Sequence, residues 1–170
     1  MRTQREQLGA RDARLDEDGF TLLELMMVIL IIGILIAVLT PLFLGATTRA
    51  KDRAMQSSLS NATTGAKSLY LAKADYTTAT PANMTAETGG ITFIAATVAP
   101  IGSNTVSVFP LSTTQLVLSG QSKSGTCFYV LDDESNGGTV YAKAPSVGGC
   151  AANTSPLPGD TSSTGWKPTW

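Results

Sequence analysis

Glu24 is the side chain whose placement most needs a chemical explanation, because it stands at the start of a long apolar run. The 24 residues from Leu25 to Thr48 carry no charge, and an ionised carboxylate inside such a helix costs about 2.5 to 3.5 kcal/mol. The carboxylate therefore needs a cation. If the chain is cut after Gly19, the new α-amine of Phe20 lies about 6 Å from Glu24 along a helix axis. This amine is then the nearest candidate for that cation.

Two interpretations of Glu24 stay open. Within one chain, the carboxylate lies near the first helical turn, where the helix dipole favours a negative charge by about 0.3 to 1 kcal/mol. Between chains, the amine of one copy meets Glu24 of a neighbour that is displaced along the helix axis. We favour the second interpretation because the run is apolar on all sides, and such a helix is either bathed in lipid or buried among other helices.

Other chemistry is largely excluded by composition. Histidine is absent and there are two cysteines, so Ser-His-Asp triads, Cys-His pairs, HExxH sites and four-thiolate zinc sites are excluded. The formal net charge is −1, and without a long basic block no specific nucleic acid is predicted as a partner. The sequence predicts neither an enzyme nor a cofactor.

Three adjacent acids, Asp132, Asp133 and Glu134, are weak candidates for a calcium site, because calcium binds clustered oxygen ligands. Their spacing matches no EF-hand pattern, and Asn136-Gly137-Gly138 follows them. A solvated hairpin turn without metal is the favoured interpretation.

The apolar run from Leu25 to Thr48 is the first element that must position Glu24 and the Phe20 amine. At 1.5 Å per residue it spans about 36 Å, enough to cross a hydrocarbon core of about 30 Å. A secretory signal peptide is disfavoured, because the run is too long and no convincing cleavage site follows it. Gly33 and Pro41 weaken the helix, so it is expected to bend or loosen there, either as an ordinary kink or as a segment that melts when the helix leaves lipid.

The segment ahead of the run is charged. Residues 1–19 contain four arginines and five acids, and without them the side chains from Phe20 onward are formally neutral. Such a segment cannot enter lipid and is predicted to be cytoplasmic and unfolded.

The string Gly19-Phe20-Thr21-Leu22-Leu23-Glu24, followed by an apolar helix with Gly33 and Pro41, resembles the type IV prepilins and the related pseudopilins of type II secretion and competence systems. The resemblance implies that a membrane-embedded prepilin peptidase cuts after Gly19 and methylates Phe20. It implies that Glu24 is the assembly glutamate. It also implies, as partners, other copies of the chain, related pilins and the inner-membrane assembly machinery.

Past Thr48 the chain turns polar but keeps a helical period as far as Lys73, and strand-like runs with turn signals follow. The helical stripe comprises Met55, Leu59, Ala62, Ala66, Leu69 and Ala72. The strand-like runs are Ile91–Val98, Thr105–Phe109, Gln115–Ser119, Thr126–Leu131 and Val140–Ala144. The expected fold is α+β: a long N-terminal helix, its first half transmembrane, packs by its second half on an antiparallel sheet of about four strands. The connection between helix and sheet is expected to be irregular.

A bond between Cys127 and Cys150 would close a loop worth about 3 kcal/mol, and their position resembles the C-terminal disulfide loop of type IV pilins. A redox or metal pair is disfavoured. The tail after it is rich in Ser, Thr, Pro and Gly, which indicates flexibility, although Trp166 and Trp170 could anchor it to the sheet or to a neighbouring subunit. The expected divisions are a cleaved leader (1–19), a polymerisation helix (20–48), a globular domain (49–150) and the tail (151–170).

The sequence therefore favours a structural pilin that begins as a single-pass inner-membrane precursor and ends in a cell-surface filament. Adhesion, motility or DNA uptake would then be properties of that fibre. Two alternatives stay open. One is a pseudopilin of a secretion or competence system, and the other is a single-pass anchored extracellular binding module.

Overall fold

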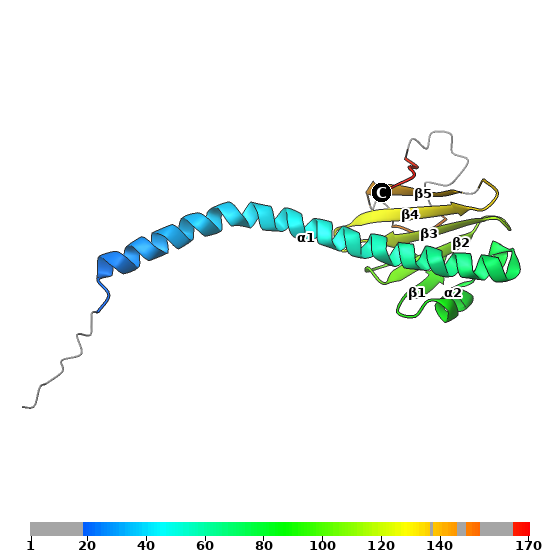
Figure 1. Ribbon diagram of the computed structural model, residues 1–170, viewed down its shortest axis with the longest axis horizontal. Coiled ribbons are helices and arrows are strands. Elements are labelled where there is room, and N and C mark those ends of the chain that lie inside the picture. The colour runs from blue at the N-terminus through cyan, green and yellow to red at the C-terminus, as the bar shows by residue number, and fades with distance from the viewer. Residues whose placement is uncertain (1–18, 137, 146–148, 154–164) are drawn as a thin grey trace, which may run out of the picture. The chain divides into compact units, whose positions relative to one another are not determined.

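The computed structural model describes residues 19–136, 138–145, 149–153 and 165–170, apart from the side chains at 41, 42 and 44. Residues 1–18 of the predicted leader (1–19) lie outside this description. The elements follow in the order α1 (Leu22–Lys73), a 3-10 turn (Tyr76–Thr78), α2 (Pro81–Glu87), β1 (Thr92–Ala95), β2 (Thr105–Pro110), β3 (Gln115–Gln121), β4 (Thr126–Asp133) and β5 (Gly138–Pro145) (Figure 1). The chain divides into two compact units, one ending at Leu42 and a globular unit from Phe43 to Trp170.

Helix α1 has 52 residues, which confirms the single long helix expected from the sequence. Its backbone is helical across both Gly33 and Pro41, so loosening at these positions stays a prediction about the assembled state. In the globular unit the stripe from Met55 to Leu69 is buried as expected. Ala72 is exposed instead, because Tyr76 packs on Tyr70 with ring centroids 4.7 Å apart and closes the core one turn earlier.

The sheet has five strands in the order β1-β2-β3-β4-β5, so the α+β prediction is confirmed with one strand more than expected. The pairs from β2 to β5 are antiparallel, whereas β1 runs parallel to β2, with Thr92 beside Thr105. A parallel pair needs a crossover rather than a hairpin. The strand predicted over Ile91–Val98 accordingly ends at Ala95, and the rest of that run belongs to the crossover, which turns at Gly102 with φ of 90°.

Helix α2 replaces part of the irregular connection expected between the helix and the sheet. Its N-cap is Thr80, whose hydroxyl accepts a hydrogen bond from the Asn83 N–H at 3.3 Å, and Pro81 occupies the first turn. A capping threonine followed by proline is a helix-start signal. Met84 anchors this helix in the core.

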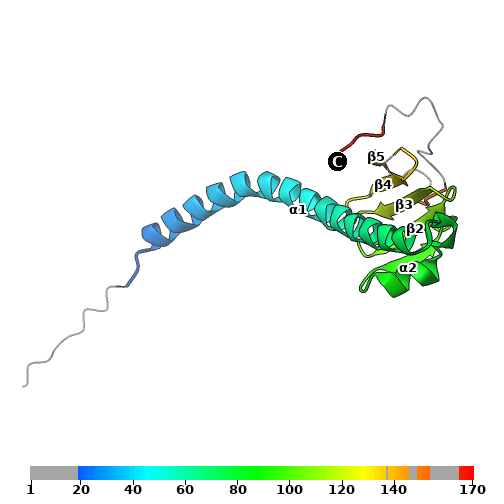
Figure 2. The ribbon, with the colours of Figure 1, turned by 45° about the vertical axis from the view of Figure 1, so that its right-hand side comes forward.

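Both faces of the sheet are covered. Alternate residues of a strand point to opposite faces, and β4 sends Phe128 and Val130 toward the α1 side, into the main hydrophobic cluster. Cys127, Tyr129 and Leu131 point to the other face and pack in two smaller clusters under the disulfide segment and Trp166. Figure 2 shows α1 lying along one face of the sheet within the globular unit.

Close contact between α1 and the sheet depends on Gly120 of β3. A Cβ built on this glycine would lie 2.1 Å from the Cε atom of Met55, so any larger residue would force the methionine out of its place. The glycine therefore allows α1 to seat directly on the middle of the sheet.

The described part of the tail, residues 165–170, wraps the edge of β5. Trp166 packs on the outer face of the sheet. Lys167 then exchanges two backbone hydrogen bonds with Tyr141, of 2.8 and 2.9 Å. Trp170 packs against Phe128 and Tyr141, with ring centroids 5.2 and 4.7 Å apart. Of the two alternatives that the sequence left open for the tryptophans, the structure shows anchoring to the chain's own sheet.

A disulfide joins Cys127 of β4 to Cys150, across a sequence separation of 23. The Cys150 carbonyl also accepts a hydrogen bond from the buried Ser119 hydroxyl at 2.5 Å. Together these bonds hold Cys150 against the outer face of the sheet.

Replacing both Cys127 and Cys150 by serine should lower the free energy of unfolding of the globular unit by about 3 kcal/mol, because the unfolded chain regains the freedom that the bond removes. Chemical denaturation of the oxidised protein and the double variant measures this difference. Reductant should bring the wild type to the stability of the variant and leave the variant unchanged. A reductant effect of equal size on both would show that the bond is not its source.

Candidate functional site

Glu24 lies in the first turn of α1, and Thr21 caps that turn. The Glu24 N–H donates to the Thr21 hydroxyl at 3.2 Å, and the Leu25 N–H donates to the Thr21 carbonyl at 3.2 Å. Threonine at the N-cap with glutamate three residues later has the sequence form of a capping box. The sequence did not single out Thr21 as the residue that caps this helix.

Gly19 and Phe20 precede the helix in non-helical backbone. Both residues are exposed, and a Cβ built on Gly19 would meet nothing within 4 Å. Both residues that flank the predicted cut are therefore exposed to solvent. Thr21 then separates the cut site from the first helical residue, Leu22.

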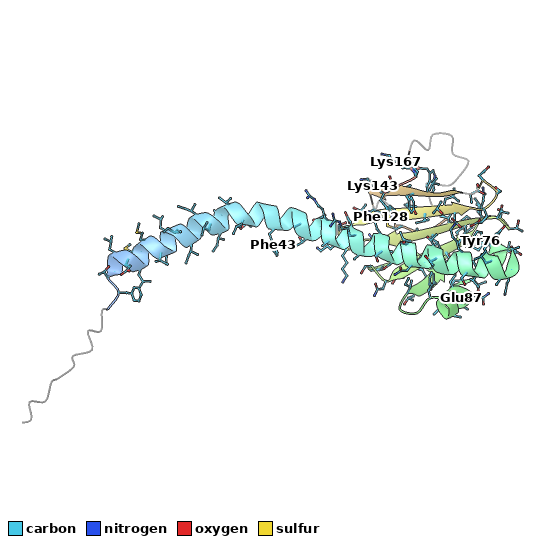
Figure 3. The ribbon with its side chains drawn as sticks, viewed as in Figure 1. Phe43, Tyr76, Glu87, Phe128, Lys143 and Lys167 are labelled. Carbon is cyan, nitrogen blue, oxygen red and sulfur yellow. A yellow bond between two sulfur atoms is a disulfide. The ribbon has the colours of Figure 1, made fainter. Side chains whose placement is uncertain are left out.

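The first half of α1 exposes a continuous apolar surface. Every large apolar side chain from Leu22 to Leu39 is at least 48% exposed, and none of the most apolar window is buried. Gly33 and Ala37 form part of a shallow apolar groove on this surface. By length and composition the helix can cross a membrane. Figure 3 shows these side chains projecting on all sides of the helix.

The acidic triplet is not the solvated turn expected from the sequence. Asp132 is 1% exposed and lies in β4, on the α1 side of the sheet. Its carboxylate accepts hydrogen bonds from the Tyr76 hydroxyl and, at 2.5 Å, from the Thr139 hydroxyl. Lys67 of α1 adds an ion pair at 3.0 Å. The prediction was wrong for Asp132 because its partners come from the far end of α1, the 3-10 turn and β5.

Lys67 joins two members of the triplet, since its ammonium also lies 3.1 Å from Glu134. Burial lowers the pKa of Lys67, but hydrogen bonds to Asp132 and Glu134 outweigh burial and raise that pKa above its ordinary value. Burial, followed by the hydrogen bond to Asp132, raises the pKa of Tyr76 well above its ordinary value. Lys67 therefore stays charged and Tyr76 stays protonated at neutral pH.

Asp133 is also buried, at the end of β4. It accepts hydrogen bonds from the Ser135 hydroxyl at 2.5 Å, the Gln115 amide at 2.8 Å and the Asn136 amide at 3.0 Å. The Ser135 hydroxyl is the largest influence on its pKa; despite opposing burial, these bonds lower the pKa of Asp133 well below its ordinary value. Across the described ranges, no three His, Cys, Asp or Glu side chains are grouped so that they could hold a metal ion.

Acid should remove the stability that Asp133 contributes. Its folded-state pKa is depressed, so the contribution is present above the unfolded value of about 3.9 and is lost as pH falls through the folded value. Asp133→Asn should be less stable than the wild type at pH 7, with a gap that shrinks as pH falls below about 4. Urea denaturation between pH 2 and pH 7 measures the gap. A gap that is constant over this range would contradict an ionic role.

These features are a capped apolar helix, long enough and apolar enough to cross a membrane, and a disulfide-bonded globular unit, in a pilin-like α+β arrangement. Comparison with protein families is more specific. Residues 14–40 match the prokaryotic N-terminal methylation motif, and the chain thus carries the signature of type IV prepilins and pseudopilins. This confirms the resemblance found in the sequence, and the motif denotes structural subunits rather than a class of enzymes. Neither the curated proteins nor the solved structures gave a match to the chain.

Proposed function

We propose that the chain is a pilin subunit which, once its leader is removed, polymerises through α1 into a type IV pilus-like filament. One observation carries the proposal: the first half of α1 is apolar on all sides and wholly exposed, with Glu24 at its start. Lipid covers such a surface while the precursor sits in the inner membrane. Neighbouring helices cover it in a filament.

Prepilin peptidase is the first partner of the proposed pathway. It cuts after Gly19, which frees the α-amine of Phe20, and it methylates that amine. The match to the methylation motif spans the cut site and the apolar helix, which supports this step. Inner-membrane assembly machinery then moves the mature subunit from the membrane into the growing fibre.

The amine and Glu24 give assembly its register. In lipid, Glu24 is costly unless it is paired, and the apolar surface of α1 offers no other charged group between Leu25 and Thr48. The Phe20 amine of an incoming subunit therefore pairs with Glu24 of a subunit already in place. If the helix of the incoming subunit is shifted along its axis, both charges stay unpaired. The pair therefore favours one axial position of each helix relative to its neighbour.

The mature protein should begin with N-methylphenylalanine at Phe20. Mass spectrometry of the N-terminal peptide from membranes and from sheared surface material tests this expectation. Gly19→Val should keep Met1 and accumulate in the membrane, because a branched side chain replaces the glycine at the cut. Wild-type chains that all begin at Met1 would overturn the proposal.

A pseudopilin is the second candidate, because the same motif marks both groups. The disulfide between Cys127 and Cys150 favours a pilus, since it reinforces a domain displayed outside the cell. Electron microscopy of sheared filaments, with peptide identification, separates the two. A pilus should yield long fibres that contain this chain, whereas a short pseudopilus should leave the sheared fraction without it.

A further inference from the structure

Two grooves at the β5 edge of the globular unit share Trp170 and Lys143 in their walls. The first, of 440 Å³, is also lined by Tyr141 and Lys167. The second, of 430 Å³, reaches α1 at Gln56. Each volume lies in the range of small-molecule sites, which bind ligands through an apolar wall and a few convergent polar groups.

Trp170 supplies a fixed aromatic surface. Its ring meets Phe128 edge to face and Tyr141 at a tilt, with centroids 5.2 and 4.7 Å apart. Phe128 is only 2% exposed, while Trp170 is 38% exposed. One part of the indole is thus held by the core and the other part faces solvent. An aromatic face carries negative charge density, and it attracts the C–H groups on the flat side of a sugar ring.

Lys143 and Lys167 place positive charge beside this ring. Both are exposed, one on β5 and one on the tail segment paired with it, and Figure 3 shows them at the same edge. The ion pairs found among the described residues involve Lys67 alone. The carboxylate of Asp52, which lines the second groove, accepts a hydrogen bond from Ser124. The two lysines are therefore available to an anionic ligand.

We infer that this surface binds an acidic polysaccharide, with one sugar ring on Trp170 and a carboxylate of the polymer between Lys143 and Lys167. A peptide strand is disfavoured, because the outward backbone groups of Tyr141 are already bonded to Lys167. Nucleic acid is disfavoured, because two lysines neutralise few phosphates and the chain has a formal net charge of −1. The inference does not depend on filament formation.

Polygalacturonic acid is the probe for this site, with dextran as the neutral comparison and a thymidine oligonucleotide as the nucleic-acid comparison. Titration of the full chain in an uncharged detergent, followed by calorimetry, should show binding of polygalacturonic acid alone. Lys143→Gln with Lys167→Gln should weaken binding at least about tenfold. Lys123→Gln, an equally exposed change at another turn of the sheet, should leave binding unchanged.

Trp170→Leu should also weaken binding, whereas Trp170→Tyr should restore most of it, because tyrosine keeps an aromatic face. Thermal unfolding shows whether each variant keeps the wild-type fold, and the lysine variants, which change exposed side chains, should do so. Failure of polygalacturonic acid to bind would overturn the inference. Equal binding of dextran or the oligonucleotide, or equal binding by the double lysine variant, would also overturn it.

Discussion

Replacing Glu24 by glutamine should abolish filaments while the protein still inserts in the membrane. The Thr21 hydroxyl accepts a hydrogen bond from the backbone N–H of residue 24, which glutamine keeps, so the cap at the start of α1 is preserved. Glutamine carries no charge, and the Phe20 amine of the next subunit loses its partner. Electron microscopy of the sheared fraction measures the loss of filaments, and immunoblotting of membranes measures the precursor that remains.

Thr21→Ala is the matched control for that experiment. It removes the capping hydroxyl, at a cost of about 1 kcal/mol to the helix, but keeps the carboxylate of Glu24. Filaments should therefore persist. Glu24→Ala removes the charge but keeps the backbone N–H that donates to Thr21, so it should behave like the glutamine variant. Normal filaments from Glu24→Gln, or loss of filaments from Thr21→Ala alone, would refute the pairing between subunits.

Asp132→Ala should destabilise the globular unit by about 3 kcal/mol or more, because it leaves buried polar groups without a hydrogen-bond partner. The Tyr76 and Thr139 hydroxyls lose their acceptor at once. Lys67→Met should cost less, since the lysine side chain is 43% exposed and the buried Asp132 carboxylate keeps the hydrogen bonds from Tyr76 and Thr139. Denaturation followed by tryptophan fluorescence measures both changes.

Alkaline pH offers an independent check on this cluster. The folded-state pKa values of Tyr76 and Lys67 are both raised, so the stability they contribute is present below their unfolded values, about 10 to 10.4, and is lost as pH rises beyond them. In Asp132→Ala, the free energy of unfolding should fall less steeply as pH rises. Glu87→Gln, an exposed change on α2, should stay within about 0.5 kcal/mol of the wild type. An Asp132 variant as stable as this control would contradict the role of the cluster.

The sequence predicted what depends on local pattern. The helical period continues past the apolar run to Leu69, which predicted one long helix, and strand-like runs between turn signals located β2 to β5. The burial of Asp132 was not readable, because its partners Lys67 and Tyr76 lie 65 and 56 positions earlier in the chain. An acidic triplet beside glycines looks solvated until the fold places a lysine over it.

Two other differences have physical causes of the same kind. The parallel pairing of β1 depends on how the crossover returns, which propensity does not encode. The tail was judged by its Ser, Thr, Pro and Gly content, yet Trp166 and Trp170 fix residues 165–170 through contacts with the sheet. Helix α2 was within reach, because Thr80 and Pro81 are a helix start.

The wrapped edge of β5 limits strand pairing between the sheets of neighbouring copies of this protein. An open edge strand is a template on which another sheet can grow, and closely packed copies would otherwise be driven toward fibrous aggregates. Lys167 pairs with the backbone of Tyr141 in the middle of β5. Pro145 and Pro168 lack the backbone N–H that another strand would need for pairing. Copies held close together in the proposed filament would therefore meet no open β5 edge on which another strand could pair.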